Sequence, residues 1–346
     1  MQLWNDYFSE DATYPSQMFR RRFRMNKPLF MRIVDRLSAE ISYFQQRRDA
    51  TGRFGHSPLH KAMAAIRMMA YGCPADAVDE YLRLGETPTL LCLEHFVEGI
   101  INLFGDEYLR RLTLDDLQQL LDIKEIRGFP GMIGSIDCMH WEWKNCPNAW
   151  KGQYTRGSGK PTIVLEAVAS QDLWIRHAFF GPLVELQKLI TLSRDTSTIW
   201  LTISYGIYPK WATFVQSIPL LQGPKASLFA THQEAVRKDV ESAFGVLQAR
   251  FAIVKNPALL WDKIKIGKIM RACIILHNMI IEDERDGYTQ FDVSVFAQPE
   301  SNRISQVDLT YSIDMPSNLG NMMSIRNRVR VKTIHQQLKA DLVEHI

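Results

Sequence analysis

Two acidic residues stand in sequence contexts that suit metal-dependent cleavage of phosphodiester bonds. Asp137 ends an apolar run that starts at Gly131, and Glu241 lies within the amphipathic run 233–250. That chemistry needs carboxylates from separate elements around two ions roughly 3.5–4 Å apart, and oxygen ligands of this kind suit Mg²⁺ or Mn²⁺. A strand-borne Asp and a helix-borne Glu would supply two of them. Such a site requires a third carboxylate between them, and we find none in a matching context.

Each of the two acids also has a plain structural interpretation. An ionised Asp at the end of a buried strand is costly without a cation, which favours a ligand role for Asp137, but an Asp that turns outward has the same spacing. Glu241 lies one turn before Gly245, where a glycine leaves room for another element. An exposed ion pair with Arg237, four residues earlier, is the interpretation of Glu241 that spacing alone favours.

The stretch 141–160 combines cations with aromatic rings. Cations bind phosphates and aromatic faces stack on bases, so this stretch is the part of the chain best suited to nucleic acid. An aromatic loop core beneath a solvated basic rim would have the same composition. The candidate contacts are Lys144, Lys151, Arg156 and Lys160, which alternate with Trp141, Trp143, Trp150 and Tyr154.

Two further polar groups invite a functional interpretation. The run Phe19–Arg24 carries four arginines that suit nuclear import or phosphate contact, although a charged helix end is the commoner explanation. His277 and Asn278 lie within an apolar helical stretch. Their position predicts a buried polar pair rather than a catalytic or ligating pair.

The composition is that of an ordinary globular protein. Its 346 residues suit about two domains, and 46% of them are hydrophobic and 23% charged. No apolar stretch approaches the roughly 18–20 residues needed to cross a bilayer, and the N-terminus lacks the features of a signal peptide, so we expect no membrane partner. The net charge of +3 is too small to indicate a polyanionic partner by itself.

The five cysteines form no Cys-x-x-Cys pair, and their number is odd. This pattern suits a reducing compartment, the nucleus or the cytoplasm, rather than a disulfide framework. Cys138, His140 and Cys146 are close enough in sequence to suggest zinc. No second Cys/His pair follows at finger spacing, so we do not expect a zinc site.

Residues 1–125 are predicted to form a helical N-terminal region. Ser57 followed by Pro58 marks a helix start, and Gly72 marks its end. A short helix ending at Gly85 and a third helix over 89–104 resemble a helix-turn-helix unit. The third helix contains no Lys or Arg, on which DNA contacts rely heavily. A plain helical bundle is therefore the favoured interpretation.

Residues 126–285 are predicted to form an α/β domain, because strands come first and long helices follow. The expected strands are 132–138, 162–169 and 173–180, the last two joined by a hairpin at 170–172, and the expected helices are 231–254 and 261–284. Residues 286–346 are expected to be an irregular tail that ends in a short basic helix.

Four sequence strings, found in consistent order, resemble PIF/Harbinger transposases. The likeness is closest to the plant harbinger transposase-derived nuclease-like proteins of the DDE superfamily, and it runs from about Phe19 to Glu284. Each string alone is weak, but the four together are specific. They are Gly131–His140, Gly206–Pro209, Val240–Phe251 and Leu276–Asn278.

The resemblance implies an RNase H-like domain that cleaves DNA with a divalent metal, Mg²⁺ or Mn²⁺, held by an Asp-Asp-Glu triad. Asp137 matches the first triad position and Glu241 the third. The family's second Asp directly precedes the Gly206–Pro209 string, and here that residue is Tyr205. A tyrosine, with a pKa near 10, is neutral at pH 7 and cannot supply the charge that holds two cations together.

The segment before Tyr205 departs from the family pattern as well. Residues 183–204 are shorter than that pattern and lack its small-residue loop, as a frame change or a mis-spliced exon would produce. Asp195 is ten positions upstream and would replace the missing acid only after a chance refolding. We therefore expect an RNase H-like domain with an altered central segment and impaired DNA cleavage.

The resemblance also implies partners and a location. Harbinger-type transposases work with a separate Myb-like protein that supplies DNA binding and nuclear import, and a helix without Lys or Arg suits protein contact. Two alternatives to an impaired nuclease remain. One is a catalytically inactive nuclear adaptor that binds chromatin or Myb-like proteins, and the other is a decayed transposase product that folds poorly.

Overall fold

The computed structural model describes residues 2–110, 113–156, 159–182, 200–203, 214–216, 223–260 and 262–286. Contacts divide these residues into two units. The first unit consists of the residues up to Arg110 together with those from Gly245 onward, and the second consists of the residues between them. No helix among these residues is long and apolar enough to cross a membrane.

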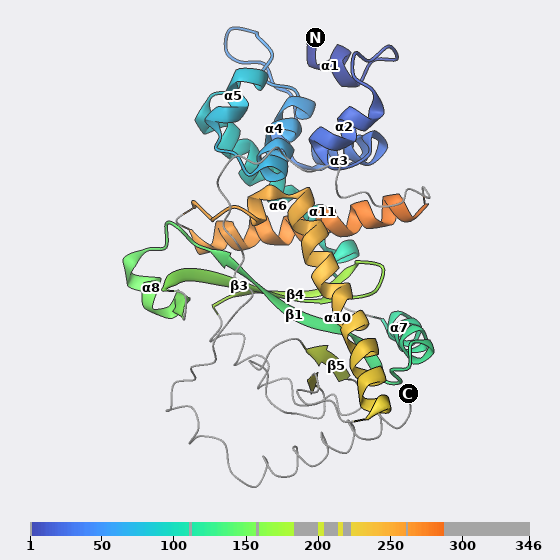
Figure 1. Ribbon diagram of the computed structural model, residues 1–346. Coiled ribbons are helices and arrows are strands. Elements are labelled where there is room, and N and C mark those ends of the chain that lie inside the picture. Colours follow the sequence, from blue (N-terminus) through green and yellow to red (C-terminus); the bar gives the residue numbers. More distant parts are fainter. Residues whose placement is uncertain are drawn as a thin grey trace. The chain divides into compact units, whose positions relative to one another are not determined.

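The first unit is built from helices, which confirms the prediction of a helical N-terminal region. An α-helix that carries large apolar side chains on one face must bury that face against another element. Its elements are α1 (Gln2–Tyr7), α2 (Ser16–Phe23), α3 (Lys27–Glu40), η1 (Ser42–Phe44), α4 (Pro58–Tyr71), α5 (Asp76–Leu82), α6 (Glu86–Tyr108), η2 (Ala252–Val254) and α11 (Lys263–Asp286) (Figure 1).

Both predicted boundaries of α4 are confirmed. The Ser57 hydroxyl accepts a hydrogen bond from the His60 amide, 3.2 Å away, and Pro58 takes the first helical position. Gly72 ends the helix with a φ of +57°. A Cβ at Gly72 would lie 2.8 Å from the carbonyl of Ala252, so no larger residue fits there without a shift of the backbone.

Helix α6, the candidate reading helix, lies in the core of the first unit and packs against α3, α4 and α11. Its acidic side chains meet lysines of α11, since Glu94 pairs with Lys265 at 2.8 Å and Glu98 with Lys268 at 2.5 Å. This use of its acids agrees with the bundle interpretation. The helix-turn-helix interpretation of α5 and α6 stays a prediction.

A buried polar cluster joins the end of α10 (Pro224–Arg250) to α11. The Arg250 guanidinium is fully buried and donates to the Glu284 carboxylate at 2.6 Å, while Arg20 donates to its other oxygen at 2.6 Å. Arg250 also donates to the His277 carbonyl at 3.3 Å, and the Asn278 amide donates to the Tyr108 carbonyl at 2.8 Å. His277 and Asn278 are thus the buried polar pair that the sequence predicts.

The second unit contains the sheet and confirms the α/β fold class. Its elements are α7 (Leu114–Ile126), β1 (Met132–Glu142), α8 (Asn148–Tyr154), β2 (Thr155–Arg156), β3 (Lys160–Ala169), β4 (Ile175–Gly181), β5 (Trp200–Ile203), β6 (Phe214–Gln216) and α10 up to Phe244. All three strands and both helices expected in this half of the sequence are present, with boundaries shifted by a few residues.

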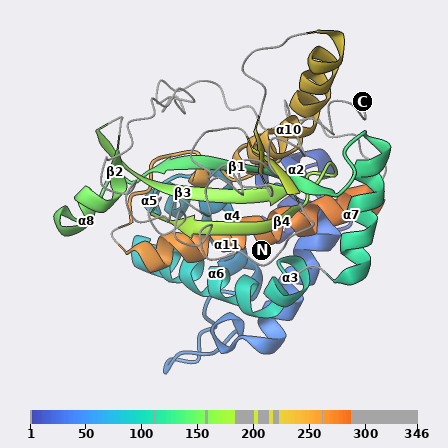
Figure 2. The ribbon, with the colours of Figure 1, turned by 90° about the horizontal axis from the view of Figure 1, so that it is seen from below.

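The sheet has an antiparallel half and a parallel half. Strand β3 pairs antiparallel with both β1 and β4 and lies between them in Figure 2. On its other edge β1 pairs in parallel with β5, and β5 pairs in parallel with β6. The order across the sheet is therefore β4-β3-β1-β5-β6, with the short β2 paired to the start of β3.

Two local features hold the strands in register. At the predicted hairpin the Ser170 amide donates to the Trp174 carbonyl at 3.1 Å, so that β4 folds back on β3. In β1, a Cβ at Gly134 would lie 3.0 Å from the Val168 side chain and 3.2 Å from the Ala169 carbonyl. Gly134 is therefore the residue that allows close approach of β3.

The contact units divide the chain differently from the predicted boundaries at residues 125 and 285. Residues 245–286 group with the N-terminal helices, because α11 packs against α6 and its buried polar groups meet partners on α2 and α6. A boundary drawn from the sequence alone assumes that successive residues belong to the same domain. It cannot show that a later segment of the chain packs with the N-terminal helices. The predicted boundaries between independent domains stay predictions.

The polar cluster makes a testable difference between two glutamates of the first unit. We expect Glu284→Gln to lower the free energy of unfolding by about 3–5 kcal/mol, because it leaves the buried Arg250 guanidinium without its anion. Glu94→Gln removes an exposed ion pair and should lower it by less than about 1 kcal/mol. Urea unfolding of the two variants measures both values, and equal losses would contradict the structural role of Glu284.

Candidate functional site

Asp137 lies in the middle of β1, on the strand face that meets α10. Ser135, two residues earlier on the same face, donates a buried hydrogen bond of 2.7 Å to the Val236 carbonyl of α10. Asp137 is 6% exposed, so it does not turn outward to solvent. Its neighbour across the strand pair is Ala167 of β3. One carboxylate oxygen accepts a 2.8 Å hydrogen bond from the Cys138 amide.

The prediction that Asp137 ends its strand is wrong. Strand β1 continues for five more residues, because the residues after Asp137 remain paired with β3 as far as Glu142. The apolar pattern of the sequence stopped at Asp137, but pairing with a partner strand continues regardless of side-chain polarity. The acid is therefore held by backbone pairing on both of its sides.

Two contacts pack α10 against β1 and the residues just before it. The Phe129 ring, just before β1, contacts the Phe229 ring at 5.8 Å between centroids, and Ser135 contacts Val236. Asp137 follows Ser135 by two residues on β1, and Glu241 follows Val236 by five residues on α10, so the two acids lie on elements that pack against each other.

Glu241 lies on a flank of α10 beside its buried face. Its carboxylate is 3.0 Å from the Arg237 guanidinium, which also contacts Glu234 at 2.9 Å, and its side chain is 39% exposed. The ion pair with Arg237 that spacing favoured is therefore present. The expectation that Gly245 admits another element is wrong for the part of the chain that the structure describes, because a Cβ there would meet no heavy atom of it within 4 Å.

Strand β5 leads the chain towards Asp137. It runs parallel to β1, and its last residue, Ile203, pairs with Ile136. Strand β5 therefore ends beside Ile136, the residue that precedes Asp137 in β1. Tyr205 follows Ile203 by two positions in the sequence, and both Tyr205 and Asp195 lie outside the described residues.

The described residues do not by themselves fit a metal pair. Within the described ranges, no group of three or more His, Cys, Asp or Glu side chains is placed to hold a metal ion. The same finding covers Cys138, His140 and Cys146, which do not form a zinc site there. A complete two-ion site would require a further carboxylate from elsewhere in the chain.

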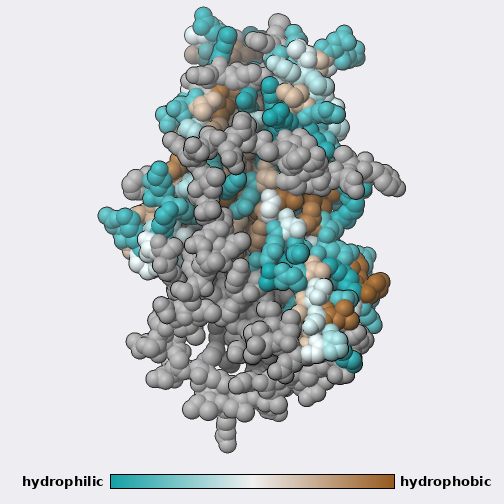
Figure 3. Space-filling view, viewed as in Figure 1, coloured by the Kyte–Doolittle hydropathy of each residue, from teal (hydrophilic) through white to brown (hydrophobic). Residues whose placement is uncertain are grey.

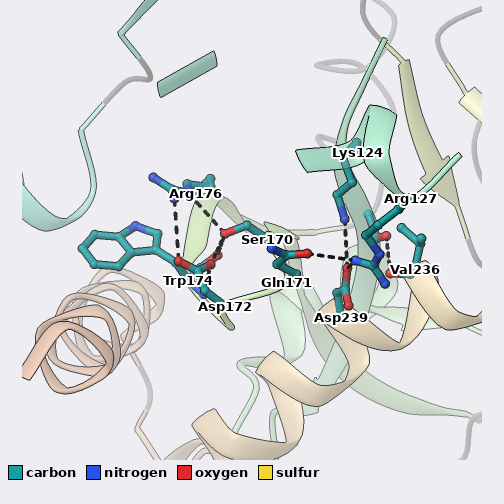
Figure 4. Close-up of polar contacts among 10 residues, drawn as sticks. Lys124, Arg127, Ser170, Gln171, Asp172, Trp174, Arg176, Val236 and Asp239 are labelled. Carbon is teal, nitrogen blue, oxygen red and sulfur yellow. Dashed lines mark hydrogen bonds and ion pairs between the residues drawn. The ribbon is translucent and has the colours of Figure 1, made fainter. Parts of the chain in front are cut away.

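A third acid of α10, Asp239, has a structural role that the sequence did not reveal. It lies 2.9 Å from the Lys124 ammonium and 2.7 Å from the Arg127 guanidinium, as Figure 4 shows. Lys124 is 1% exposed. Burial lowers the pKa of Lys124, while the neighbouring Asp239 carboxylate opposes that shift. These contacts join α7 to α10, and the Asp239 carboxylate is the anion that both Lys124 and Arg127 bind.

The aromatic residues of the 141–160 stretch form a core rather than a stacking surface. Trp143 is fully buried and contacts Tyr154 edge to face at 5.0 Å between centroids, with Trp150 at 5.9 Å. Trp141 is buried as well. The interpretation that these rings stack on bases is wrong for the buried ones, because their faces already pack on protein.

The basic rim around that core is exposed. Lys144, Lys151 and Lys160 are open to solvent, and Lys160 pairs with Glu142 at 3.3 Å. The side chain of Arg156 lies outside what the structure describes. Contact of these residues with nucleic acid stays a prediction.

The arginines of the run Phe19–Arg24 are mostly engaged within the first unit. Arg20 pairs with Glu284, Arg22 donates to the Tyr7 hydroxyl, and Arg24 is buried and donates to the Ala70 carbonyl at 3.3 Å. This favours the charged helix end over a phosphate-binding patch. Arg21 is exposed.

A cavity of about 600 Å³ opens between α7 and α10, away from the two candidate acids. Exposed apolar side chains lie near it, and Figure 3 shows hydrophobic residues at the surface over α7 and the start of α10. Neither Asp137 nor Glu241 lines this cavity. Its lining residues are Ile126, Arg127, Gly128, Thr231, His232, Ala235 and Val236.

Comparisons with known proteins agree with the resemblance seen in the sequence. The family described as plant transposon protein matches residues 106–206 and 193–288, which together cover more than half of the chain. A domain of unknown function, DUF8418, matches residues 1–38. Proteins named "Putative nuclease HARBI1" from Bos taurus and Rattus norvegicus are 22% identical over 290 residues, covering 80% of this chain and 81% of theirs. No solved structure matches.

The two acids on opposite flanks of α10 should behave differently when neutralised. Asp239→Asn leaves the buried Lys124 ammonium with a weaker partner and should lower the free energy of unfolding by about 3 kcal/mol. Glu241→Gln removes an exposed ion pair within the helix and should lower it by less than about 0.5 kcal/mol. Urea unfolding at pH 7 compares the two variants.

The loss in the Asp239→Asn variant should also depend on pH. Without the Asp239 carboxylate the pKa of Lys124 falls further below its ordinary 10.5. The unfolded chain then binds more protons than the folded chain between the two pKa values, so stability rises with pH in that window. Repeating the unfolding at pH 9 to 10 should recover part of the loss. A loss that grows with pH would show that Lys124 is not the group left unpaired.

Proposed function

This chain belongs to the family of plant transposon proteins, with harbinger transposase-derived nucleases as relatives, and on that premise we propose that it is a nuclease-type protein with impaired DNA cleavage. The proposed cause is the absence of the second acid of the triad, where Tyr205 stands. Asp137 and Glu241 are the remaining acids of that triad in this proposal.

The strand order supports an RNase H-like domain. Such a domain has three antiparallel strands, with further parallel strands added beside the first of them. The order β4-β3-β1-β5-β6, with β1 central and antiparallel to β3 but parallel to β5, has this form. In it, the first acid belongs on the central strand and the second follows the neighbouring parallel strand, which agrees with the positions of Asp137 and the end of β5.

The packing of α10 supports the assignment of the third acid. Ser135 and Val236 hold α10 along β1 on the face that carries Asp137. Glu241 follows Val236 by five residues and remains on an accessible flank of the helix. Asp239, the other acid nearby, is engaged by Lys124 and Arg127 and is a poor candidate for a metal ligand.

Charge is the physical reason for the proposed impairment. In a complete site of this type, a pair of divalent cations activates water and stabilises the leaving oxygen. Two carboxylates do not balance the positive charge of such a pair of cations. The neutral hydroxyl of a tyrosine adds no negative charge near pH 7. The family match is split into two segments that overlap at residues 193–206, the stretch in which Tyr205 lies, and this supports a departure from the family at that point.

A catalytically inactive adaptor in the nucleus is the second candidate function. The observation that favours it over a decayed product is that residues of the family strings form organised contacts. Arg250, His277 and Asn278 all take part in the buried polar contacts of the first unit, and β5 and β6 are paired into the sheet. An adaptor of this kind would bind DNA indirectly, through a Myb-like protein partner. A cooperative melting curve by circular dichroism supports it, and the absence of a transition supports decay.

The cleavage assay tests the first proposal directly. Purified protein incubated with duplex DNA and either Mg²⁺ or Mn²⁺ should show no cleavage above background, because the metal-holding set is incomplete. The Asp137→Ala variant is the control for contaminating nucleases. Cleavage by the unaltered protein that disappears in Asp137→Ala would overturn the proposal.

Restoring the acid alone should not restore activity. Tyr205→Asp returns the missing charge, but the segment 183–204 differs from the family pattern as well, so we expect cleavage to stay at background. The same assay measures it, with Tyr205→Asn as the matched control for the loss of the ring without a gain of charge. Strong metal-dependent cleavage by the Tyr205→Asp variant would show that the single charge was the whole defect.

A further inference from the structure

A basic hairpin lies between α3 and α4, and none of its residues belongs to the candidate nuclease site. Figures 1 and 2 both show the loop between these helices projecting from the helices of its own unit. Arg48 and Phe54 form an antiparallel bridge, and the Gly55 amide donates to the Arg47 carbonyl at 2.9 Å. The Asp49 amide donates to the Arg53 carbonyl at 2.9 Å and completes the pairing. We call residues 47–55 the 47–55 hairpin.

The turn of the 47–55 hairpin is held by Asp49. Its carboxylate accepts hydrogen bonds from the Thr51 amide at 2.8 Å, the Thr51 hydroxyl at 2.7 Å and the Arg53 amide at 2.9 Å. These hydrogen bonds lower the pKa of Asp49, and the bond from the Thr51 hydroxyl has the largest effect. Gly52 adopts a φ of +80°, which suits glycine. The only acid of the hairpin is therefore occupied in shaping the turn.

The cations of the hairpin are available for an external partner. Strand alternation places Arg48 and Phe54 on one face and both Arg47 and Arg53 on the other. All three arginines are exposed. Within the described ranges, no hydrogen bond or ion pair engages the side chains of Arg47 and Arg53. Arg48 stacks on Phe54, with its guanidinium 4.2 Å from the ring centroid, and Phe54 is 61% exposed.

The base of the hairpin adds positive potential. Burial is the main cause that lowers the pKa of Lys61, and the positive charge of Arg47 lowers it further. The hairpin leads directly into the N-terminus of α4, whose first turn contains no acid and whose dipole favours anions. The preceding acid in the chain, Glu40, is paired with Arg36. The segment from 47 to 61 thus carries three arginines, one lysine and a single, engaged acid.

We propose that the 47–55 hairpin binds duplex DNA, with Arg47, Arg48 and Arg53 on backbone phosphates and Phe54 against the sugar edge of a groove. Arginine binds phosphate through a rigid planar fork, and a projecting ribbon that carries arginines and one apolar side chain has the shape and charge of a groove-binding element. A single exposed ring is too small an apolar surface to insert into a membrane. The closely spaced cations match the regular negative charge of a duplex.

This inference is independent of the nuclease site, because it concerns residues of the first unit and requires no metal ion. It differs from the helix-turn-helix hypothesis as well. Helix α6 lacks Lys and Arg, and its acids Glu94 and Glu98 pair with lysines of α11, whereas the hairpin presents cations outward.

Binding of the full chain to a fluorescein-labelled duplex of about 20 base pairs, in EDTA, tests the proposal by fluorescence anisotropy over a range of salt concentrations. Each lost phosphate contact should reduce the slope of log K against log salt by about 0.9. We therefore expect a smaller slope for the triple variant Arg47→Gln, Arg48→Gln, Arg53→Gln. Its magnitude should be about 2 to 3 below that of the unaltered protein. Its affinity at 0.1 M salt should fall by more than about tenfold.

Matched controls separate a local site from the net charge of the protein. The triple variant Arg21→Gln, Arg83→Gln, Arg271→Gln removes the same charge from other exposed positions of the first unit and should keep the slope of the unaltered protein. The double variant Arg47→Gln, Arg53→Gln disturbs no internal contact and should lose about 2 from the slope. Phe54→Ala should weaken binding without changing the slope. Melting curves check that each variant is folded.

Three results would overturn the proposal. The first is a hairpin triple variant that binds like the unaltered protein or like the control triple variant. The second is loss of binding only when Lys144, Lys151 and Lys160 are changed to glutamine together. The third is an unaltered protein that fails to bind the duplex, or that binds anionic lipid vesicles instead. None of these outcomes depends on whether the protein cleaves DNA, so the two proposals fail separately.

Discussion

The packing of α10 along β1 is the constraint on which the candidate site depends. The hydrogen bond from Ser135 to the Val236 carbonyl sets the position of the helix along the strand, and the contacts of Lys124 and Arg127 with Asp239 set its rotation about its own axis. With Asp239 directed to α7, the opposite flank of the helix carries Glu241. A different rotation of α10 would move Asp239 away from Lys124 and leave that buried ammonium without its anion.

The residues that resemble the transposase family fall into two physical classes. Asp137 and Glu241 are acids on neighbouring elements of the second unit, and their interest is chemical. Arg250, His277 and Asn278 are fully buried, and since Arg250 donates to the His277 carbonyl and Asn278 to the Tyr108 carbonyl of α6, their role is to hold helices together. A buried guanidinium is tolerated only with an anion, and Glu284 supplies it. A protein that has lost cleavage could therefore keep the second class for the sake of its fold.

The differences between expectation and structure have a common physical origin. The apolar pattern ends at Asp137, but strand β1 continues beyond it. The later residues of β1 remain in the strand because they pair with β3. The alternation of tryptophans with lysines indicated a stacking surface, but the same alternation places Trp141 and Trp143 inward and leaves the lysines outside. Arginines of the run Phe19–Arg24 found partners as distant in sequence as Glu284. Each difference arises from a partner remote in the chain, which periodicity cannot identify.

The sequence by itself determined the order and type of most elements, the ends of helices marked by Ser57 and Gly72, the membership in a transposase-derived family and the lack of an acid at position 205. These properties depend on local backbone preferences or on strings of adjacent residues. Only the tertiary structure decided which acid of α10 is bound by Lys124 and Arg127, which aromatic rings are buried, and that α11 belongs with the N-terminal helices. Those outcomes depend on long-range contacts, because the burial of a charge or a ring is favourable only when a specific partner from another segment lies against it.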